Sequence, residues 1–185
     1  FKKLKKSDDI IFIGGFRHTP NIQAVKLLER EILPKVKELF GKAGISYPIV
    51  KIYGSQPNEY IKNLDNEYLS YQGFIENEED AFSSARISLA PIPFGSGMKG
   101  KTLSSLIYKT PIVGSSFAFE GFQIFPEKIA LMSELDPKVF AKNVLKAYVE
   151  SEKIDDIEWS NVHKDLNKKF SYKSFIKKLE SDLID

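Results

Sequence analysis

The chain has 185 residues, of which 42% are hydrophobic and 28% charged, with no cysteine and two histidines. This composition suits one globular domain, excludes disulfides and thiolate metal sites, and argues against a histidine metal cluster. The net charge of +2, from 27 basic and 25 acidic side chains, is too balanced to predict nucleic-acid binding by bulk electrostatics. No apolar run approaches the roughly 20 residues that a membrane-spanning helix needs, and nothing resembles a signal peptide.

Short apolar runs alternate with helical patterns along the chain. The runs predicted as strands are residues 10–14, 49–54, 68–73, 87–91, 111–114 and 129–132. This alternation is typical of βαβ units, so we expect an α/β fold with a Rossmann-like parallel sheet and helices on both faces.

A long helical pattern lies between the first two predicted strands. Its apolar side chains recur every three or four positions, at Ile22, Val25, Leu28, Ile32, Val36 and Leu39. One face of this helix should therefore pack on the sheet. We expect Thr19 as its N-cap and Pro20 as its first residue, and Pro34 should kink or divide it. Later helices are predicted over residues 57–64, 76–84, 101–109, 137–150 and 172–183.

A polar break at residues 151–156 is the main interruption of the pattern. We therefore expect one domain over residues 1–185, in which residues 151–185 form a helical tail. Because the chain begins at Phe1 within a basic stretch, we also expect another domain to precede it in a longer protein.

Residues 95–102 read Gly-Ser-Gly-Met-Lys-Gly-Lys-Thr, which satisfies the P-loop pattern. In a P-loop the backbone amides and the lysine bind phosphates, and the hydroxyl of Thr102 would reach magnesium. A nucleotide hydrolase also needs an acidic residue at the end of an apolar strand, and no predicted strand ends in one. We therefore interpret the segment as a glycine-rich loop that opens a helix and attracts an anion, and keep a P-loop nucleotidase as an alternative.

Glycines follow the first four predicted strands. They are Gly14, Gly15, Gly54, Gly73, Gly95 and Gly97. Each one alone can be explained as a strand-to-helix turn. Together they would meet at the carboxyl edge of a parallel sheet, where such sheets bind ligands.

Several segments carry a family resemblance through their order and spacing. They are residues 12–16 with His18 and Pro20-Asn21, Gly73-Phe74-Ile75, residues 90–101, residues 110–114, Glu120-Gly121-Phe122 and Phe170-Ser171-Tyr172. Nearly end to end, the chain resembles the C-terminal, donor-binding half of bacterial glycosyltransferases of the GT-B fold. The resemblance implies a nucleotide-sugar donor, a saccharide, lipid-linked or protein acceptor, and an N-terminal half of the same enzyme. It further implies sugar transfer with retention in surface polysaccharide or glycoconjugate assembly, without metal or cofactor, in the cytoplasm or at the inner face of the membrane.

The donor site implied by the resemblance draws on several loops. It comprises Gly14, Gly15, Phe16, Arg17, His18, Gly73, Phe74, Ile75, Ser96, Gly97, Met98, Lys99, Lys101, Ser104 and Glu120. Lys99 and Lys101 would bind the diphosphate through charge-assisted hydrogen bonds, and the segment around Phe74 would contact the base. Some positions have structural alternatives: Phe74 as a core residue, His18 as a loop hydrogen-bonding residue and Glu120 as a helix cap.

One departure from the family concerns two serines. Many relatives carry glutamates eight positions apart, near the donor sugar and on the ribose, where this chain has Ser96 and Ser104. Serine is shorter and uncharged, so it would hold a ribose less strongly. A degenerate, non-catalytic sugar-nucleotide-binding module therefore remains the main alternative to an enzyme.

Overall fold

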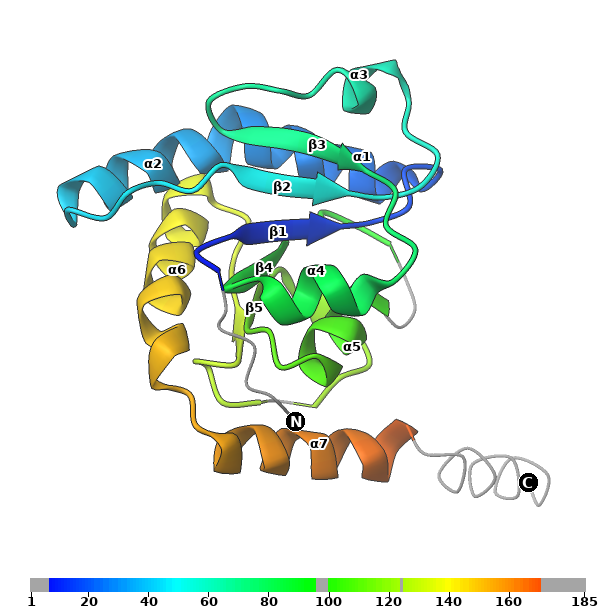
Figure 1. Ribbon diagram of the computed structural model, residues 1–185, viewed down its shortest axis with the longest axis vertical. Coiled ribbons are helices and arrows are strands. Elements are labelled where there is room, and N and C mark those ends of the chain that lie inside the picture. Colours follow the sequence, from blue (N-terminus) through cyan, green and yellow to red (C-terminus); the bar gives the residue numbers. More distant parts are fainter. Residues whose placement is uncertain (1–6, 96–99, 124, 171–185) are drawn as a thin grey trace. The chain divides into compact units, whose positions relative to one another are not determined.

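The computed structural model describes residues 7–95, 100–123 and 125–170. The chain divides into two compact units between Lys153 and Ile154. The first unit holds the sheet, and the second holds a helix near the C-terminus (Figure 1).

The first unit contains a six-stranded sheet in the order β3-β2-β1-β4-β5-β6. Its strands are β1 (Ile10–Ile13), β2 (Val50–Tyr53), β3 (Leu69–Gly73), β4 (Ile87–Ala90), β5 (Ile112–Gly114) and β6 (Ala130–Met132). Every neighbouring pair is parallel. This order is that of a Rossmann fold, and all six strands were predicted from the sequence.

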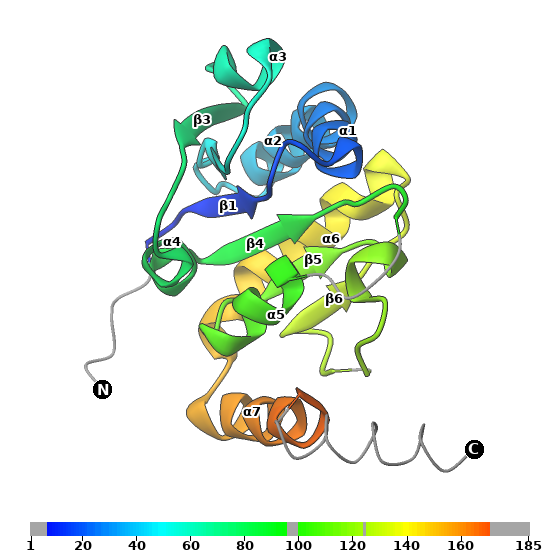
Figure 2. The same ribbon diagram turned by 90° about the vertical axis from the view of Figure 1, so that its right-hand side faces the viewer.

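Helices cover both faces of this sheet (Figure 2). One face carries α1 (Thr19–Leu27), a π-helical turn (Leu28–Ile32), α2 (Leu33–Lys42) and α6 (Pro137–Glu150), and the other carries α4 (Glu78–Ser84) and α5 (Gly100–Ile107). The remaining elements are α3 (Glu59–Lys62) and the 3₁₀ turns Ser116–Phe119 and Ser151–Lys153. Because both faces are covered, every residue of the central strands β1 and β4 is buried. The predicted Rossmann-like layers are confirmed.

The long helical pattern after β1 folds as two helices. Pro34 lies in the first turn of α2, and the π-helical turn directly precedes it. A proline ring excludes the carbonyl four residues earlier, and the wider turn accommodates it through a bond from the Leu33 N–H to the Leu28 carbonyl. The predicted division at Pro34 is therefore confirmed. Of the predicted apolar stripe, Val25, Leu28, Ile32 and Val36 are buried, whereas Ile22 and Leu39 at its ends are half-buried.

The prediction for Thr19 is wrong. Thr19 is already helical, and the N-cap is His18, which has extended backbone angles and makes no side-chain capping bond. Pro20 then occupies the second helical position. Because the first four N–H groups of a helix have no partner within it, proline is tolerated there as well as at the first position.

The second unit contains helix α7 (Asp156–Phe170), which was not predicted as a separate element. Asp155 Oδ1 accepts from the Glu158 N–H at 2.8 Å, and Glu158 Oε2 accepts from the Asp155 N–H at 3.2 Å. This reciprocal pair is a capping box, which the sequence shows as Asp-x-x-Glu. The helix predicted over residues 172–183 lies outside the described residues. No helix in the described part of the chain is long and apolar enough to cross a membrane.

Candidate functional site

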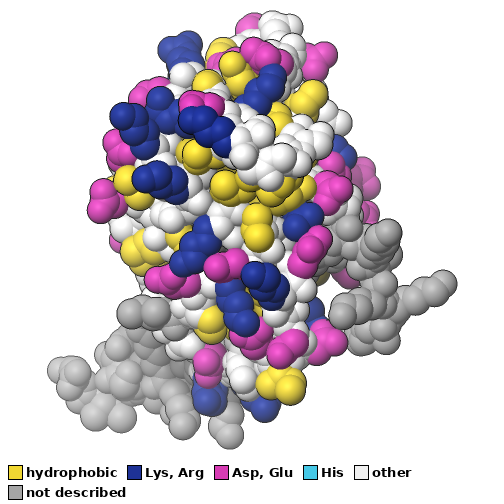
Figure 3. All heavy atoms as spheres, turned by 90° about the vertical axis from the view of Figure 1, so that its left-hand side faces the viewer, with side chains coloured by type: hydrophobic (Ala, Val, Ile, Leu, Met, Phe, Trp, Pro, Cys, Tyr) yellow, Lys and Arg dark blue, Asp and Glu magenta, His cyan; other side chains and the backbone are white. Residues whose placement is uncertain are grey.

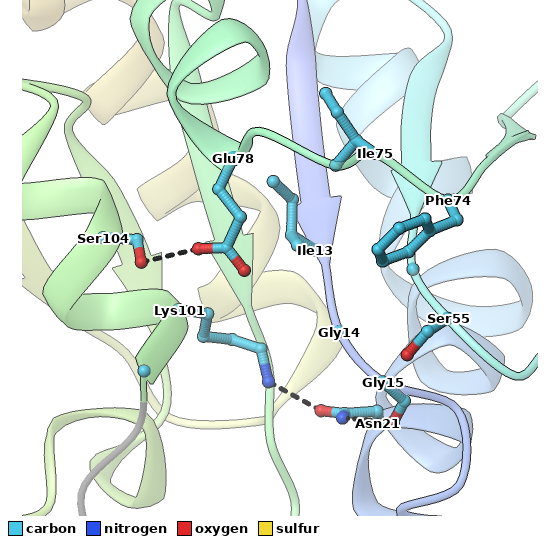
Figure 4. Close-up of a pocket in the computed structure, with 12 residues that line it drawn as sticks. Ile13, Gly14, Gly15, Asn21, Ser55, Phe74, Ile75, Glu78, Lys101 and Ser104 are labelled. Atoms are coloured by element: carbon cyan, nitrogen blue, oxygen red, sulfur yellow. Dashed lines mark hydrogen bonds between the residues drawn. The ribbon is translucent and has the colours of Figure 1, made fainter.

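A pocket of about 240 Å³ opens at the carboxyl edge of the sheet, between the ends of β1 and β4. From β1 the chain continues toward β2, whereas from β4 it continues toward β5, on the other side of the sheet. Ligands of open parallel sheets bind at such a switch point because the diverging loops leave a crevice. The pocket lining comes from the loops after β1, β2 and β3 and from α1, α4 and α5 (Figure 4).

The floor of the pocket is backbone, because two glycine turns approach each other closely. A Cβ atom added to Gly54, after β2, would lie 1.8 Å from the carbonyl oxygen of Gly14, after β1. The hydroxyl of Tyr71 donates to the Gly54 carbonyl at 2.7 Å, and burial raises the pKa of this tyrosine. The ring of Phe16 packs against Tyr71 beneath the same turn. Only glycine at position 54 keeps the loops this close.

Asn21, in the first turn of α1, joins two walls of the pocket. Its Nδ2 donates to the Gly15 carbonyl at 2.8 Å, and its Oδ1 accepts from Lys101 Nζ on α5 at 2.6 Å (Figure 4). The Asn21 side chain is 8% exposed and lies against Gly14, where an added Cβ would meet it at 2.9 Å. The Lys101 ammonium is thereby held beside the glycine loop, where it can bind an anionic group.

Buried hydroxyl groups fix the position of α5. Thr102 Oγ1 donates to the Ala118 carbonyl at 2.6 Å. Ser105 Oγ lies 2.7 Å from Ser88 Oγ on β4 and donates to the Thr110 carbonyl at 2.7 Å. These bonds turn the 102/105 face of the helix inward. Lys101 and Ser104, which also lie three positions apart, therefore face the pocket.

The hydroxyl of Thr102 bears on the P-loop alternative. A P-loop needs this oxygen at a bound magnesium ion. Here Thr102 is fully buried and its hydroxyl bonds inside the fold. The arrangement therefore argues against a nucleotidase site, although the sequence pattern is complete.

A carboxylate enters the pocket from α4. Glu78 lies in the first turn of that helix, and its Oε2 accepts from Ser104 Oγ at 2.7 Å. Because Glu78 and Ser104 both line the pocket, α4 and α5 share a polar wall (Figure 4).

An apolar wall faces the glycine loops. Phe74 is 67% exposed and its ring projects into the hollow, while Ile75 packs partly against the core cluster that contains Ile13 (Figure 4). The interpretation of Phe74 as a core residue is therefore wrong. Gly73 adopts φ of +92° directly before it, a conformation that favours glycine. This turn presents the ring at the surface, where an aromatic face can stack on a planar ligand.

The structure brings some of the predicted site residues together and leaves others apart. Those that line the pocket are Gly14, Gly15, Phe74, Ile75, Lys101 and Ser104. Those described but outside the lining are Phe16, Arg17, His18, Gly73 and Glu120. Phe16 is 2% exposed, whereas Arg17, His18 and Glu120 are exposed on their loops. Ser96, Gly97, Met98 and Lys99 lie outside the described residues.

Sequence reasoning missed three polar residues of the lining: Asn21, Ser55 and Glu78. Asn21 lies in one of the segments that carry the family resemblance, but nothing in the sequence signals its contact with a lysine 80 positions later. Glu78 is one of three consecutive acids in the first turn of α4, and all three favour a helix N-terminus. Only the packing of α4 beside α5 distinguishes it from Glu79 and Asp80.

A second hollow, of about 330 Å³, lies beside α1 and is lined by residues that include Lys26, Arg30 and Phe94. It is larger, but it lies between helical side chains and one loop. Of these two hollows among the described residues, only the first combines the switch point, the close glycine turns and polar groups from several elements. We therefore take the first pocket as the candidate site.

The opposite edge of the sheet, where the strands begin, has a different surface. Figure 3 views this side, and basic and acidic side chains are interspersed over it. Lys37 pairs with Glu67 at 2.6 Å and Lys42 with Glu38 at 2.5 Å. The hydrogen bond from Lys42 lowers the pKa of Glu38. On this side, the visible cations are mixed with carboxylates.

The sequence profile of the family described as glycosyl transferases group 1 matches residues 7–149 of the chain. No curated protein matches the chain.

Several solved structures share the fold. The structure of TarM has a TM-score of 0.73 at 14% identity, over 97% of this chain and 36% of that one. The pneumococcal O-GlcNAc transferase GtfA, in complex with UDP and GlcNAc, has a TM-score of 0.66 at 13% identity, over 100% and 37%. The catalytic domain of cholesterol-α-glucosyltransferase from Helicobacter pylori has a TM-score of 0.55 at 15% identity, over 84% of this chain and 97% of that one. The chain thus spans little more than a third of TarM and of GtfA.

Proposed function

Because the chain belongs to the group 1 glycosyl transferases, we propose that it forms the donor-binding half of a GT-B enzyme. Its donor is a nucleotide-diphospho-sugar that binds in the pocket between β1 and β4. The observation that carries this proposal is the Lys101 ammonium, held 2.6 Å from Asn21 Oδ1 beside the loop of Gly14 and Gly15.

Each wall of the pocket suits one part of such a donor. The ammonium of Lys101 and the amides of the glycine loop suit the diphosphate, and the exposed Phe74 ring suits the base. A hydrogen bond to a charged group contributes about 1.5–3 kcal/mol, so one lysine and several amides are enough for useful affinity. The pneumococcal GtfA structure is a complex with UDP and GlcNAc, which agrees with a donor of this class here.

In the proposed reaction, the bond between the anomeric carbon and the diphosphate oxygen breaks, and an acceptor hydroxyl oxygen bonds to the same carbon. The proton of the acceptor hydroxyl passes to the departing diphosphate, which leaves with the bonding electron pair. Lys101 stabilises the charge that develops on this leaving group, which lowers the barrier more than it strengthens ground-state binding. We propose that transfer retains the anomeric configuration, needs no metal and takes place in the cytoplasm.

The acceptor site is proposed to lie on an N-terminal domain, because the chain spans only 36–37% of TarM and GtfA. We expect the chain alone to bind the donor but to transfer no sugar. Sugar transfer by the isolated chain would contradict this division of labour.

Titration calorimetry tests the donor assignment. UDP-glucose, UDP-N-acetylglucosamine, GDP-mannose, dTDP-glucose and ADP-glucose are each titrated into the chain. We expect at least one to bind, and its free nucleoside diphosphate to compete for the same site. If none binds at millimolar concentration, the proposal is wrong.

A second candidate is a non-catalytic sugar-nucleotide-binding module, favoured by Ser104, an uncharged residue at the pocket where many relatives carry glutamate. Both candidates bind the donor. They differ in turnover by the full-length protein with its N-terminal domain: the enzyme releases nucleoside diphosphate when acceptor is added, and the degenerate module does not.

A further inference from the structure

Among the described residues that line the pocket, Glu78 is the only acid and Lys101 the only base. Lys101 lies one helical turn before Ser104, which holds the Glu78 carboxylate at 2.7 Å. A bound anion will place its charge at Lys101 and keep it away from Glu78, because like charges repel at this range. The group near Glu78 should therefore be neutral and rich in hydrogen-bond donors.

The hydrogen-bonding capacity at Glu78 fits a pair of hydroxyl groups. An ionised carboxylate only accepts hydrogen bonds, and its two oxygens offer about four acceptor positions. Ser104 uses one of these positions, on Oε2. Oε1 and the lone pairs of the Ser104 hydroxyl remain suited to donors from a ligand. Two neighbouring hydroxyls can donate to this pair.

The order of the walls indicates which hydroxyls these are. Glu78 follows Phe74 by four residues and stands on the helix beside the one that carries Lys101. The side chains of Phe74, Glu78 and Lys101 turn toward the same hollow (Figure 4). In a nucleoside diphosphate, the ribose lies between the base and the phosphates. The hydroxyls that adjoin both the aromatic wall and the cationic wall are therefore those of the ribose.

We propose that Glu78, positioned by Ser104, accepts hydrogen bonds from the ribose hydroxyls of the donor and selects ribonucleotides over deoxyribonucleotides. This inference rests on the proposed function, because it presupposes that a nucleoside diphosphate binds in this pocket. It narrows the donor class, since dTDP-sugars lack the 2′-hydroxyl and are disfavoured.

A purely structural role for Glu78 makes a different prediction. Glu78, Glu79 and Asp80 all lie in the first turn of α4, where acids favour the helix dipole. If Glu78 had only that role, Glu78→Gln and Glu79→Gln would behave alike. Glu79 does not line the pocket, so Glu79→Gln is the matched control that removes the same charge from the same helical turn.

Calorimetric titrations with UDP, GDP and ADP, each beside its 2′-deoxy counterpart, test the inference on the intact chain and both variants. We expect the unaltered chain to bind the ribonucleotide about tenfold more tightly than its deoxy form. Glu78→Gln should lower the ribonucleotide affinity about tenfold and lower that of the deoxy form, which keeps only its 3′-hydroxyl, by much less, so that most of the preference is lost. Glu79→Gln should keep the preference for the ribonucleotide.

The possible failures are distinguishable. If none of these nucleotides binds the unaltered chain, the proposed function fails and this inference fails with it. If they bind without a preference for ribose, or if Glu78→Gln weakens both forms equally, this inference fails while the proposed function stands. Thermal melting of both variants identifies an equal loss that comes from unfolding.

Discussion

The two faces of α5 carry polar side chains at the same spacing but in opposite surroundings. Thr102 and Ser105 point into the fold, where their hydroxyls donate to the carbonyls of Ala118 and Thr110. Lys101 and Ser104 point into the pocket, toward Asn21 and Glu78. One helix thus separates groups that hold the structure together from groups that are available to a ligand, and changes on the two faces should have separable effects.

The largest effect is expected at Gly54, which both lines the pocket and lets two loops pack closely. A Cβ atom there would lie 1.8 Å from the Gly14 carbonyl oxygen and 2.7 Å from the Phe16 ring. Gly54→Ala should lower the free energy of unfolding by about 3 kcal/mol or more and also weaken donor binding, because the loops must separate. Chemical denaturation and calorimetry measure the two effects. Gly41→Ala, in α2 with nothing within 4 Å of the added Cβ, is the control and should not destabilise.

On the pocket face of α5, Lys101→Ala should reduce affinity for the nucleoside diphosphate about tenfold or more, because one charge-assisted bond is lost. The free energy of unfolding should change by about 1 kcal/mol or less, because water in the open pocket can donate to Asn21 Oδ1 in place of the ammonium. Lys42→Ala removes the same charge at the far end of α2 and should leave binding intact. Equal affinities for Lys101→Ala and the unaltered chain would remove Lys101 from the site.

On the inner face, Thr102→Val should do the reverse. It keeps the side-chain shape but leaves the buried Ala118 carbonyl without its donor, at a cost of about 1–3 kcal/mol of stability. Donor affinity measured below the melting temperature should stay within about twofold. Thr102→Ser keeps the hydroxyl and should recover most of the loss. A variant that is fully stable but cannot bind would restore the P-loop interpretation of Thr102.

Sequence patterns predicted the architecture well because they record burial directly. Six apolar runs became six parallel strands, and the glycines after β1 and β2 do meet at the switch point. Pro34 also divides the first helix as expected, because its ring acts on the turn next to it.

The site was predicted only in part, because its polar contacts join distant segments. Nothing local distinguishes Glu78 from Glu79, or directs Asn21 toward Lys101 across the pocket. The P-loop pattern was misleading for a related reason. Residues 100–102 match the last three positions of the pattern, but the packing of α5 on the sheet turns the Thr102 hydroxyl inward. Helix α7 lies inside the predicted helical tail but was not predicted as an element of its own, since its apolar residues are few, although its Asp-x-x-Glu capping box is visible in the sequence.

The central claim is that a nucleoside diphosphate binds between the glycine loop and α5. Amide chemical shifts of the isotopically labelled chain, followed by NMR as UDP, GDP or ADP is added, test it most directly. We predict the largest shifts at Gly14, Gly15, Gly100 and Lys101, all of which line the pocket. Shifts confined to the second hollow, around Lys26 and Arg30, or no saturable shifts at all, would contradict the claim.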